Sequence, residues 1–153
     1  METSQDASGI VEMARELALA LHDPHPPITA EALLRDGLGP ERWYDCWVAQ
    51  NDLELAGYAL ACRSFEAHTG KRRLWLGDLY VRPSTRLQGV GRSLFAAVAR
   101  RAISLGCDAV YWELWKQNAH GTSFYRQLNA QEVGDLAIMR LQGEGLARIA
   151  DDA

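Results

Sequence analysis

The chain has 153 residues, the size of one ordinary domain, and we expect a single domain over residues 1–153. Apolar residues make up 48% and charged residues 24%, a balance that excludes an intrinsically disordered chain. The 16 basic and 20 acidic side chains give a net charge of −4. A general nucleic-acid binder, which needs a basic face, is therefore not expected.

The sequence also indicates a compartment. No apolar run approaches the ~20 residues of a membrane span, and the N-terminus lacks the basic start and apolar stretch of a signal peptide. We therefore expect a cytoplasmic protein with no membrane partner. Cys46, Cys62 and Cys107 are widely spaced, which predicts buried thiols in a reducing compartment. The histidines lack metal-ligand spacing, so no metal is expected.

Hydrophobic periodicity predicts the secondary structure. In chain order, the pattern predicts a helix at 9–22, a short helix at 30–35, strands at 45–50, 56–65 and 72–81, a long helix from about 89 to 105, a strand at 108–115, a helix at 119–128 and a strand at 131–141. Residues 143–153 give weak signals. This order predicts a mixed α/β (α+β) fold in which one long helix links two strands.

A glycine-rich segment, residues 86–93, lies between the third predicted strand and the long helix. Gly89 and Gly91 remove Cβ atoms that would keep an oxyanion away from the backbone amides. The helix start offers unpaired N–H groups and the positive end of a dipole, and Arg86 and Arg92 add charge. A pyrophosphate fits such a loop, and a purely structural turn is the alternative explanation of the glycine pair. The dinucleotide fingerprint is not met, because Leu94 stands at its third glycine.

Two blocks of sequence together resemble the GNAT superfamily of N-acetyltransferases. The first is Arg-x-x-Gly-x-Gly at 86–91, preceded by Asp78-Leu79-Tyr80-Val81. The second is Asn118, followed by Phe124-Tyr125 and Asn129-Ala130. The resemblance covers residues 10–141. Three stretches, at residues 29–39, 70–81 and 118–125, are similar to the branch that acetylates diamines, such as spermidine, spermine and thialysine.

The resemblance implies a fold and a co-substrate. It implies a mixed central sheet with splayed middle strands, flanked by helices, with the first strand short or missing, and a homodimer. It also implies that acetyl-CoA lays its pantetheine arm along the backbone of Leu79, Tyr80 and Val81 and bonds to Asn118. Tyr125 would be the general acid for the departing thiolate. The residues that would hold the diphosphate are Arg86, Leu87, Gln88, Gly89, Val90, Gly91 and Arg92.

The resemblance leaves the base open. An alkylammonium with a pKa of ~10.4 needs about 4 kcal/mol to lose its proton near neutral pH, so a carboxylate that accepts the proton would help. Diamine-type members carry Glu-Asp on the third strand, whereas this chain has Gly77-Asp78. Asp78 is one candidate base, and a structural role is its alternative. Glu113 is the other candidate, because Trp112-Glu113-Leu114 is similar to the protein N-terminal acetyltransferase branch, although a solvated carboxylate explains it equally well.

We expect an acetyl-CoA-dependent N-acetyltransferase that acts on a primary amine of a small molecule, an amino acid derivative or a diamine-like compound. Residues 20–22, Ala-Leu-His, lack the acid that diamine-type members place late in their first helix, which weakens the case for polyamines. A protein or peptide N-terminal acetyltransferase and a non-catalytic acyl-CoA-binding module are the alternatives.

Overall fold

A computed structural model describes residues 4–22, 27–51, 54–134 and 137–151. The chain divides into two compact units, residues 1–113 and 114–153, and each is described by itself. The single domain expected over 1–153 therefore stays a prediction. No helix in the described ranges combines the length and the apolar character needed to cross a membrane.

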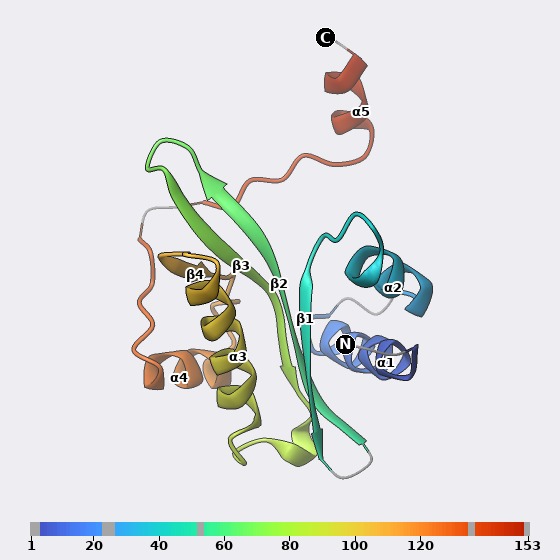
Figure 1. The fold of residues 1–153 in the computed structure, drawn as a ribbon, viewed down its shortest axis with the longest axis vertical. Helices are drawn as coiled ribbons and strands as arrows, with labels where there is room; N and C mark the ends of the chain where they lie inside the picture. The colour runs from blue at the N-terminus through green and yellow to red at the C-terminus, as the bar shows by residue number, and fades with distance from the viewer. Residues whose placement is uncertain (1–3, 23–26, 52–53, 135–136, 152–153) are drawn as a thin grey trace. The chain divides into compact units, whose positions relative to one another are not determined.

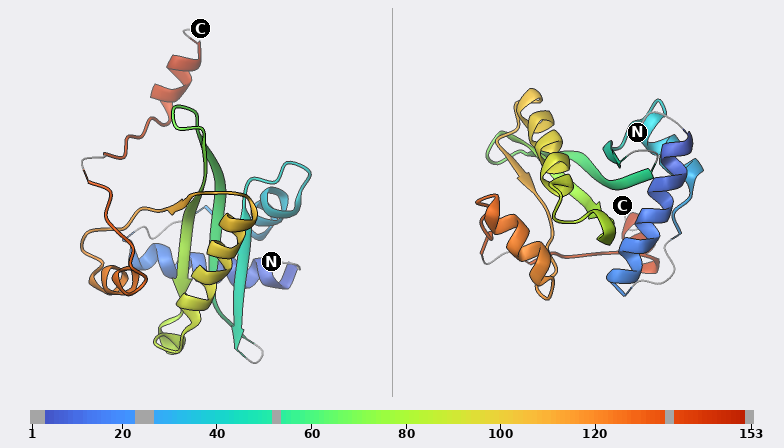
Figure 2. Two further views of the ribbon diagram at one scale, coloured as in Figure 1. Left: turned by 60° about the vertical axis from the view of Figure 1, so that its left-hand side comes forward. Right: turned by 90° about the horizontal axis from the view of Figure 1, so that it is seen from below.

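The first unit is a four-stranded sheet covered by helices on both faces (Figures 1 and 2). Its elements in chain order are α1 (Ser4–Ala20), α2 (Ala30–Leu38), β1 (Asp45–Asn51), β2 (Glu54–Glu66), β3 (Lys71–Val81), the 3-10 turn η1 (Pro83–Thr85), α3 (Val90–Ser104) and β4 (Ala109–Tyr111). The strand order is β1-β2-β3-β4, with β3 and β4 parallel and the other pairs antiparallel. The predicted mixed α/β fold is confirmed.

Two apolar clusters lie on opposite faces of this sheet. On one face, α1 and α2 pack against the strands through Ala7, Ile10, Val11, Met13, Leu33, Tyr58 and Tyr80. On the other face, α3 packs through Ala59, Ala61, Leu74, Leu76, Leu94, Val98 and Ala102. Burial of these side chains holds the helices on the sheet, because apolar area removed from water contributes about 25 cal/mol per Å².

A β-bulge interrupts the pairing of β2 with β3. The register passes from Leu60 opposite Asp78 to Ala61 opposite Leu76, so Gly77 is the extra residue. A Cβ built on Gly77 meets only Leu60, at 3.4 Å from its Cδ2, so the bulge does not require glycine for space.

The bulge reverses the side-chain alternation of β3. Before it, Leu76 faces α3; after it, Leu79 packs on the α3 side and Tyr80 joins the α1 cluster. Asp78 consequently shares the α1 face with Tyr80. With strict alternation from Leu76, Asp78 would have faced α3 instead.

The middle strands of the sheet separate along their length. β3 pairs with β4 only at Arg73, Leu74 and Trp75, and then continues to Val81 bonded to β2 alone. This is the splay that the family resemblance implies. It leaves one edge of residues 76–81 open along the strand. Strand pairing of β4 ends at Tyr111, so the strand predicted at 108–115 is wrong in its length.

The second unit contains α4 (Ala119–Gln127) and α5 (Glu144–Asp151). The strand predicted at 131–141 is wrong, because residues 131–134 and 137–141 form no strand; residues 135 and 136 of the predicted strand lie outside the described residues. A strand exists only through pairing, and the apolar side chains Ile138, Met139 and Leu141 are exposed there. The helix α5 was not predicted from the weakly patterned tail.

Helix α1 also begins earlier than the predicted residue 9. Its polar first turn carries no apolar periodicity, so sequence reasoning could not extend it to Ser4. The described chain is helical from that residue, and no strand precedes α1 within the described part.

Candidate active site

The loop between η1 and α3 presents a row of backbone donors. Leu87 and Gly89 adopt left-handed conformations, with φ of 62° and 85°. The first helical bond of α3 runs from the Ser93 N–H to the Gly89 carbonyl at 2.9 Å. The first N–H groups of an α-helix have no intrahelical acceptor, and at this end of α3 they are those of Val90, Gly91 and Arg92. Unpaired N–H groups at the start of a helix are suited to an anion.

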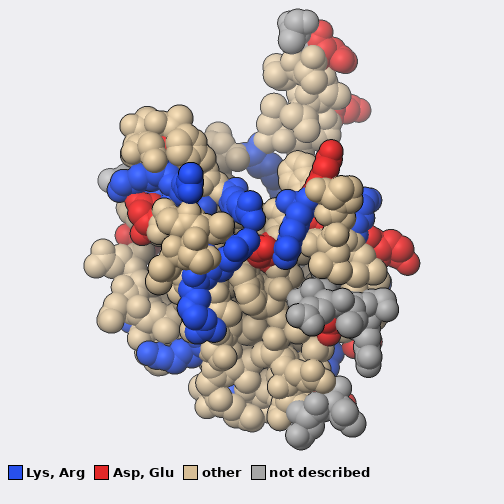
Figure 3. All heavy atoms as spheres, viewed as in Figure 1, with Lys and Arg blue, Asp and Glu red and all other residues tan. Residues whose placement is uncertain are grey.

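Two arginines border this loop. Arg92 is exposed in the first turn of α3, whereas most Lys and Arg side chains of the face shown in Figure 3 gather higher up, away from the loop. The Arg86 Nε donates to the Val81 carbonyl at 3.0 Å, which fixes this guanidinium at the end of β3. The predicted cradle therefore combines backbone donors with full charges. The Val81 carbonyl, which was expected to bind the pantetheine arm, accepts this hydrogen bond from Arg86.

Asp78 lies in the first unit beside a buried tyrosine. The Tyr58 hydroxyl donates to Asp78 Oδ2 at 2.9 Å, and Tyr58 is only 1% exposed. Burial raises the pKa of Asp78 above its usual range, and the hydrogen bond from Tyr58 opposes that rise. Burial also raises the pKa of Tyr58, so its hydroxyl remains a donor at neutral pH.

A second polar group joins α1 to the end of β3. The Tyr80 hydroxyl donates to Glu16 Oε2 at 2.9 Å, and Arg82 Nη2 lies 3.3 Å from a carboxylate oxygen of Glu12 and of Glu16. Sequence reasoning missed Tyr58, Glu12 and Glu16. The spacing of the two glutamates, four residues apart on one helix face, was the available signal.

Glu113 stands apart from these groups. It is exposed, whereas the preceding Trp112 packs edge-on against Phe95 with ring centroids 5.4 Å apart. Glu113 lies beyond the end of β4 at Tyr111. This position suits a solvated carboxylate, because Glu113 is exposed to solvent whereas Asp78 is partly buried.

In the second unit, Asn118 caps α4. Its Oδ1 accepts from the Gly121 N–H at 2.8 Å, so the oxygen is committed to the helix. A Cβ at Gly121 would lie 2.7 Å from Asn118 Nδ2, so glycine at 121 makes room for the cap. The Nδ2 group is the part of Asn118 that can donate to a ligand.

Tyr125 lies on α4, half-buried, with its ring centroid 5.0 Å from that of Phe124. Burial raises the pKa of Tyr125 to about 12, so the phenol keeps its proton at neutral pH. A protonated phenol in a partly dry position can donate a proton to a forming thiolate.

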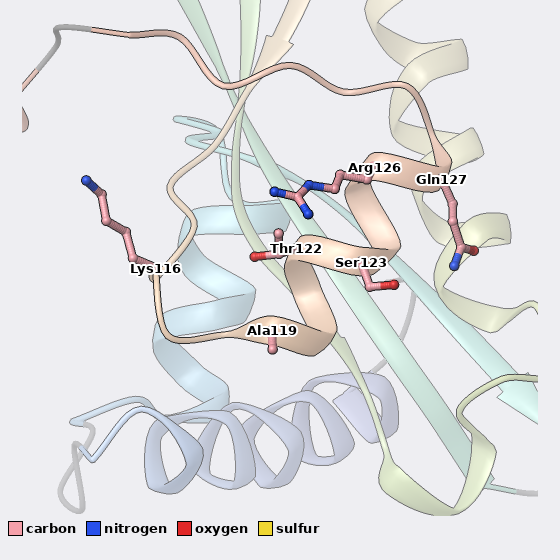
Figure 4. Close-up of a pocket in the computed structure, with 6 residues that line it drawn as sticks. All are labelled: Lys116, Ala119, Thr122, Ser123, Arg126 and Gln127. Atoms are coloured by element: carbon pink, nitrogen blue, oxygen red, sulfur yellow. The ribbon is translucent and has the colours of Figure 1, made fainter.

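A pocket of about 550 Å³ lies against α4, and Figure 4 shows the side chains that line it. It is lined by Lys116, Ala119, Thr122, Ser123, Arg126 and Gln127. Two cations and two hydroxyls make this surface suitable for an anionic group. In the described residues, no three His, Cys, Asp or Glu side chains are grouped to hold a metal.

Residues 10–130 match the Acetyltransferase (GNAT) family. The chain is 31% identical over 158 residues to thialysine N-epsilon-acetyltransferase of Mus musculus, covering 95% of this chain and 92% of that enzyme. It is 31% identical over 99 residues to L-ornithine N5-acetyltransferase of Arabidopsis thaliana, covering 65% of this chain and 43% of the plant enzyme.

The fold is similar to that of ribosomal-protein-alanine N-acetyltransferase from Brucella melitensis, with a TM-score of 0.70 and 19% identity. The superposition covers 90% of this chain and 95% of the Brucella chain.

These matches define the class of protein. The chain belongs to the GNAT family, whose members use acetyl-CoA, and it is an N-acetyltransferase. The thialysine N-epsilon-acetyltransferases of Bos taurus and Mus musculus are each matched over 92% of their length, in agreement with the diamine branch indicated by the sequence.

The cap of α4 gives a first testable prediction. Asn118→Ala removes the acceptor for the Gly121 N–H and should lower the free energy of unfolding by about 1 kcal/mol. Asn118→Asp retains an acceptor at the positive helix end and should keep wild-type stability. Urea unfolding measures both. Equal midpoints for the two variants would show that the cap contributes nothing.

Proposed function

We propose that this protein transfers an acetyl group from acetyl-CoA directly to a primary amine of a small molecule, an amino acid derivative or a diamine-like compound. The observation that carries this proposal is the glycine-rich loop at the start of α3, where the first N–H groups of the helix lie beside Arg86 and Arg92, in a chain whose relatives are named for acetylating ornithine and thialysine. Acetyl-CoA supplies the activated acyl group.

The residues of the loop fit the proposed co-substrate. A diphosphate requires several donors within reach and no Cβ in the way, and Gly89 meets no neighbouring atom within 4 Å at its Cβ position. Arg86 and Arg92 would balance its charge. The open edge of β3 at Leu79 and Tyr80 suits an extended arm that bonds to backbone groups, and the Asn118 Nδ2 would donate to the same arm.

Asp78 is the base that we favour. The acceptor nitrogen must lose a proton before it can attack, and a carboxylate whose pKa is raised toward neutrality takes that proton more readily than an ordinary one. Glu113 lacks this environment, so the role that N-terminal acetyltransferases give to such a glutamate is not favoured here. Tyr125 would return a proton to the departing sulfur.

The charges on α1 argue for a compact acceptor. Both glutamates near the end of β3, Glu12 and Glu16, are paired with Arg82. The single guanidinium offsets half of their negative charge, so the group retains a net charge of −1 for a cationic acceptor. Gly77 adds no carboxylate. An amine with one or two charged groups fits this balance better than a polyamine.

Two finer expectations belong to the same proposal. A homodimer is supported by the open edge of β1 at one side of the sheet, which a second copy could cover. A cytoplasmic location is supported by the cysteines Cys46, Cys62 and Cys107, none of which forms a disulfide.

The proposal is tested by incubating the protein with acetyl-CoA and pooled amines: ornithine, lysine, thialysine, short diamines, spermidine and an N-terminal peptide. Mass spectrometry should detect acetylated small amines in excess over acetylated spermidine and peptide. Product from the peptide alone would overturn the proposed acceptor class, and tight acetyl-CoA binding without any product would overturn catalysis.

The role of Tyr125 predicts a specific kinetic defect. Tyr125→Phe removes the proton donor and should lower kcat by about 100-fold, while the KM for acetyl-CoA changes little. Tyr111→Phe is the matched control, because it keeps the ring beneath the Arg73 guanidinium, 4.5 Å from its centroid, and should retain wild-type kcat. Unchanged turnover in Tyr125→Phe would remove this residue from the mechanism.

The choice of base predicts different outcomes for two carboxylates. Asp78→Asn should lower kcat/KM by about 100-fold or more, whereas Glu113→Gln should leave it nearly unchanged. In the wild type, kcat/KM should fall as the pH drops through the raised pKa of Asp78, at higher pH than for an ordinary aspartate.

Stability provides the control for this comparison. A carboxyl whose pKa is raised by folding stabilises the fold below its unfolded pKa, and this contribution is lost as the pH rises through the folded value. Asp78→Asn should therefore be as stable as the wild type, or more stable, in urea unfolding at pH 8. Full activity of Asp78→Asn with loss of activity in Glu113→Gln would reverse the assignment.

A further inference from the structure

We propose that Tyr58 is a positioning residue for Asp78: its hydroxyl holds Oδ2 and leaves Oδ1 as the atom that accepts the proton of the amine. This inference rests on the proposed function, because it takes Asp78 as the base. It assigns a role in turnover to a residue inside the core of the sheet, which would otherwise count only toward stability.

The geometry fixes the Tyr58 hydroxyl firmly. Tyr58 stands opposite Tyr80 in the register, and Leu60 stands opposite Asp78, so Tyr58 and Asp78 are diagonal neighbours on the α1 face. The ring is 1% exposed within the α1 cluster, and its centroid lies 6.4 Å from that of Tyr80. The hydroxyl of this phenol donates to the Asp78 carboxylate, 2.9 Å away.

The same arrangement depends on the bulge at Gly77. The extra residue turns Asp78 onto the face that Tyr58 occupies, as the change of alternation after Leu76 shows. Without the bulge, the carboxylate and the phenol would lie on opposite faces of the sheet. The bulge therefore determines the face on which the Asp78 carboxylate lies, and the hydrogen bond from Tyr58 determines its orientation.

The other groups around Asp78 give it no compensating charge. The titratable groups near it are the thiols of Cys46 on β1 and Cys62 on β2, and the phenol of Tyr80 on β3, which donates to Glu16 of α1. Arg82, which follows β3, pairs with Glu12 and Glu16, and in the described residues no Lys or Arg pairs with Asp78.

The hydrogen bond from Tyr58 is thus the interaction that favours the charged carboxylate. Burial raises the pKa of Asp78, and the Tyr58 hydroxyl lowers it again. The pKa of Tyr58 itself lies well above its ordinary value because the ring is buried, so the phenol donates throughout the working range and cannot replace Asp78 as the base.

Tyr58→Phe tests this role, because it removes the hydroxyl and keeps the ring. The acidic limb of the pH profile of kcat/KM should move to higher pH. At pH 6 the kcat/KM of the variant should be about tenfold below that of the wild type, and at pH 9 the two should agree within about twofold. Tyr44→Phe is the matched control. It removes a hydroxyl that donates to the Leu33 carbonyl at 2.5 Å, and should affect stability without moving the limb.

A second measurement does not need turnover. In protein labelled with ¹³C at aspartate carboxyls, the Asp78 resonance, assigned by its loss in Asp78→Asn, should titrate at higher pH in Tyr58→Phe than in the wild type. If Tyr58→Phe fails to fold, 3-fluorotyrosine placed at position 58 keeps the hydroxyl, makes it a stronger donor, and should move the titration to lower pH.

The outcomes separate this inference from the proposed function. Superimposable titrations of wild type and Tyr58→Phe, with Asp78→Asn inactive, overturn the role of Tyr58 and leave the function intact. Full activity of Asp78→Asn removes the base and overturns the role of Tyr58 with it. A shifted limb and a shifted resonance in Tyr58→Phe, both absent from Tyr44→Phe, support it.

Discussion

One extra residue in β3 determines which side chains the end of that strand presents. Because Gly77 has no partner across the ladder, the alternation that places Leu76 against α3 reverses, and Asp78 comes to face α1. After the bulge, the apolar residues of β3 still pack on α3, and its polar groups lie on the other face. The separation of β3 from β4 after Trp75 gives the same stretch an open edge. A carboxylate and unpaired backbone groups therefore occupy one short segment.

Sequence reasoning located the parts of this site that depend on local rules. The glycine-rich loop follows from Gly89 at a helix start, and the long helix follows from apolar spacing. The cap at Asn118 was not predicted, although it too follows a local rule, the preference of short polar side chains for helix N-termini. Each of these features is set by residues within one or two turns of each other. Such features can be recognised without knowing the tertiary structure.

The parts of the site that were not predicted from the sequence depend on contacts between distant segments. The pairing of Tyr58 with Asp78 spans twenty residues and needs a bulge, which shifts the register without a strong sequence signal. The contact of Glu16 with Tyr80 depends on how α1 crosses the sheet. The prediction of a strand at 131–141 was wrong for a different reason. Its apolar residues suit a strand, but a strand also requires a neighbour to bond to, and no local pattern supplies that condition.

The cysteines around Asp78 have a practical consequence for anyone who follows the reaction by trapping released coenzyme A. Burial raises the pKa of the Cys46 thiol to about 11, and burial also raises that of Cys62. Disulfide reagents react with thiolates, and these two side chains hold very little thiolate near neutral pH. A colorimetric reagent should therefore consume the product much faster than either of these two thiols.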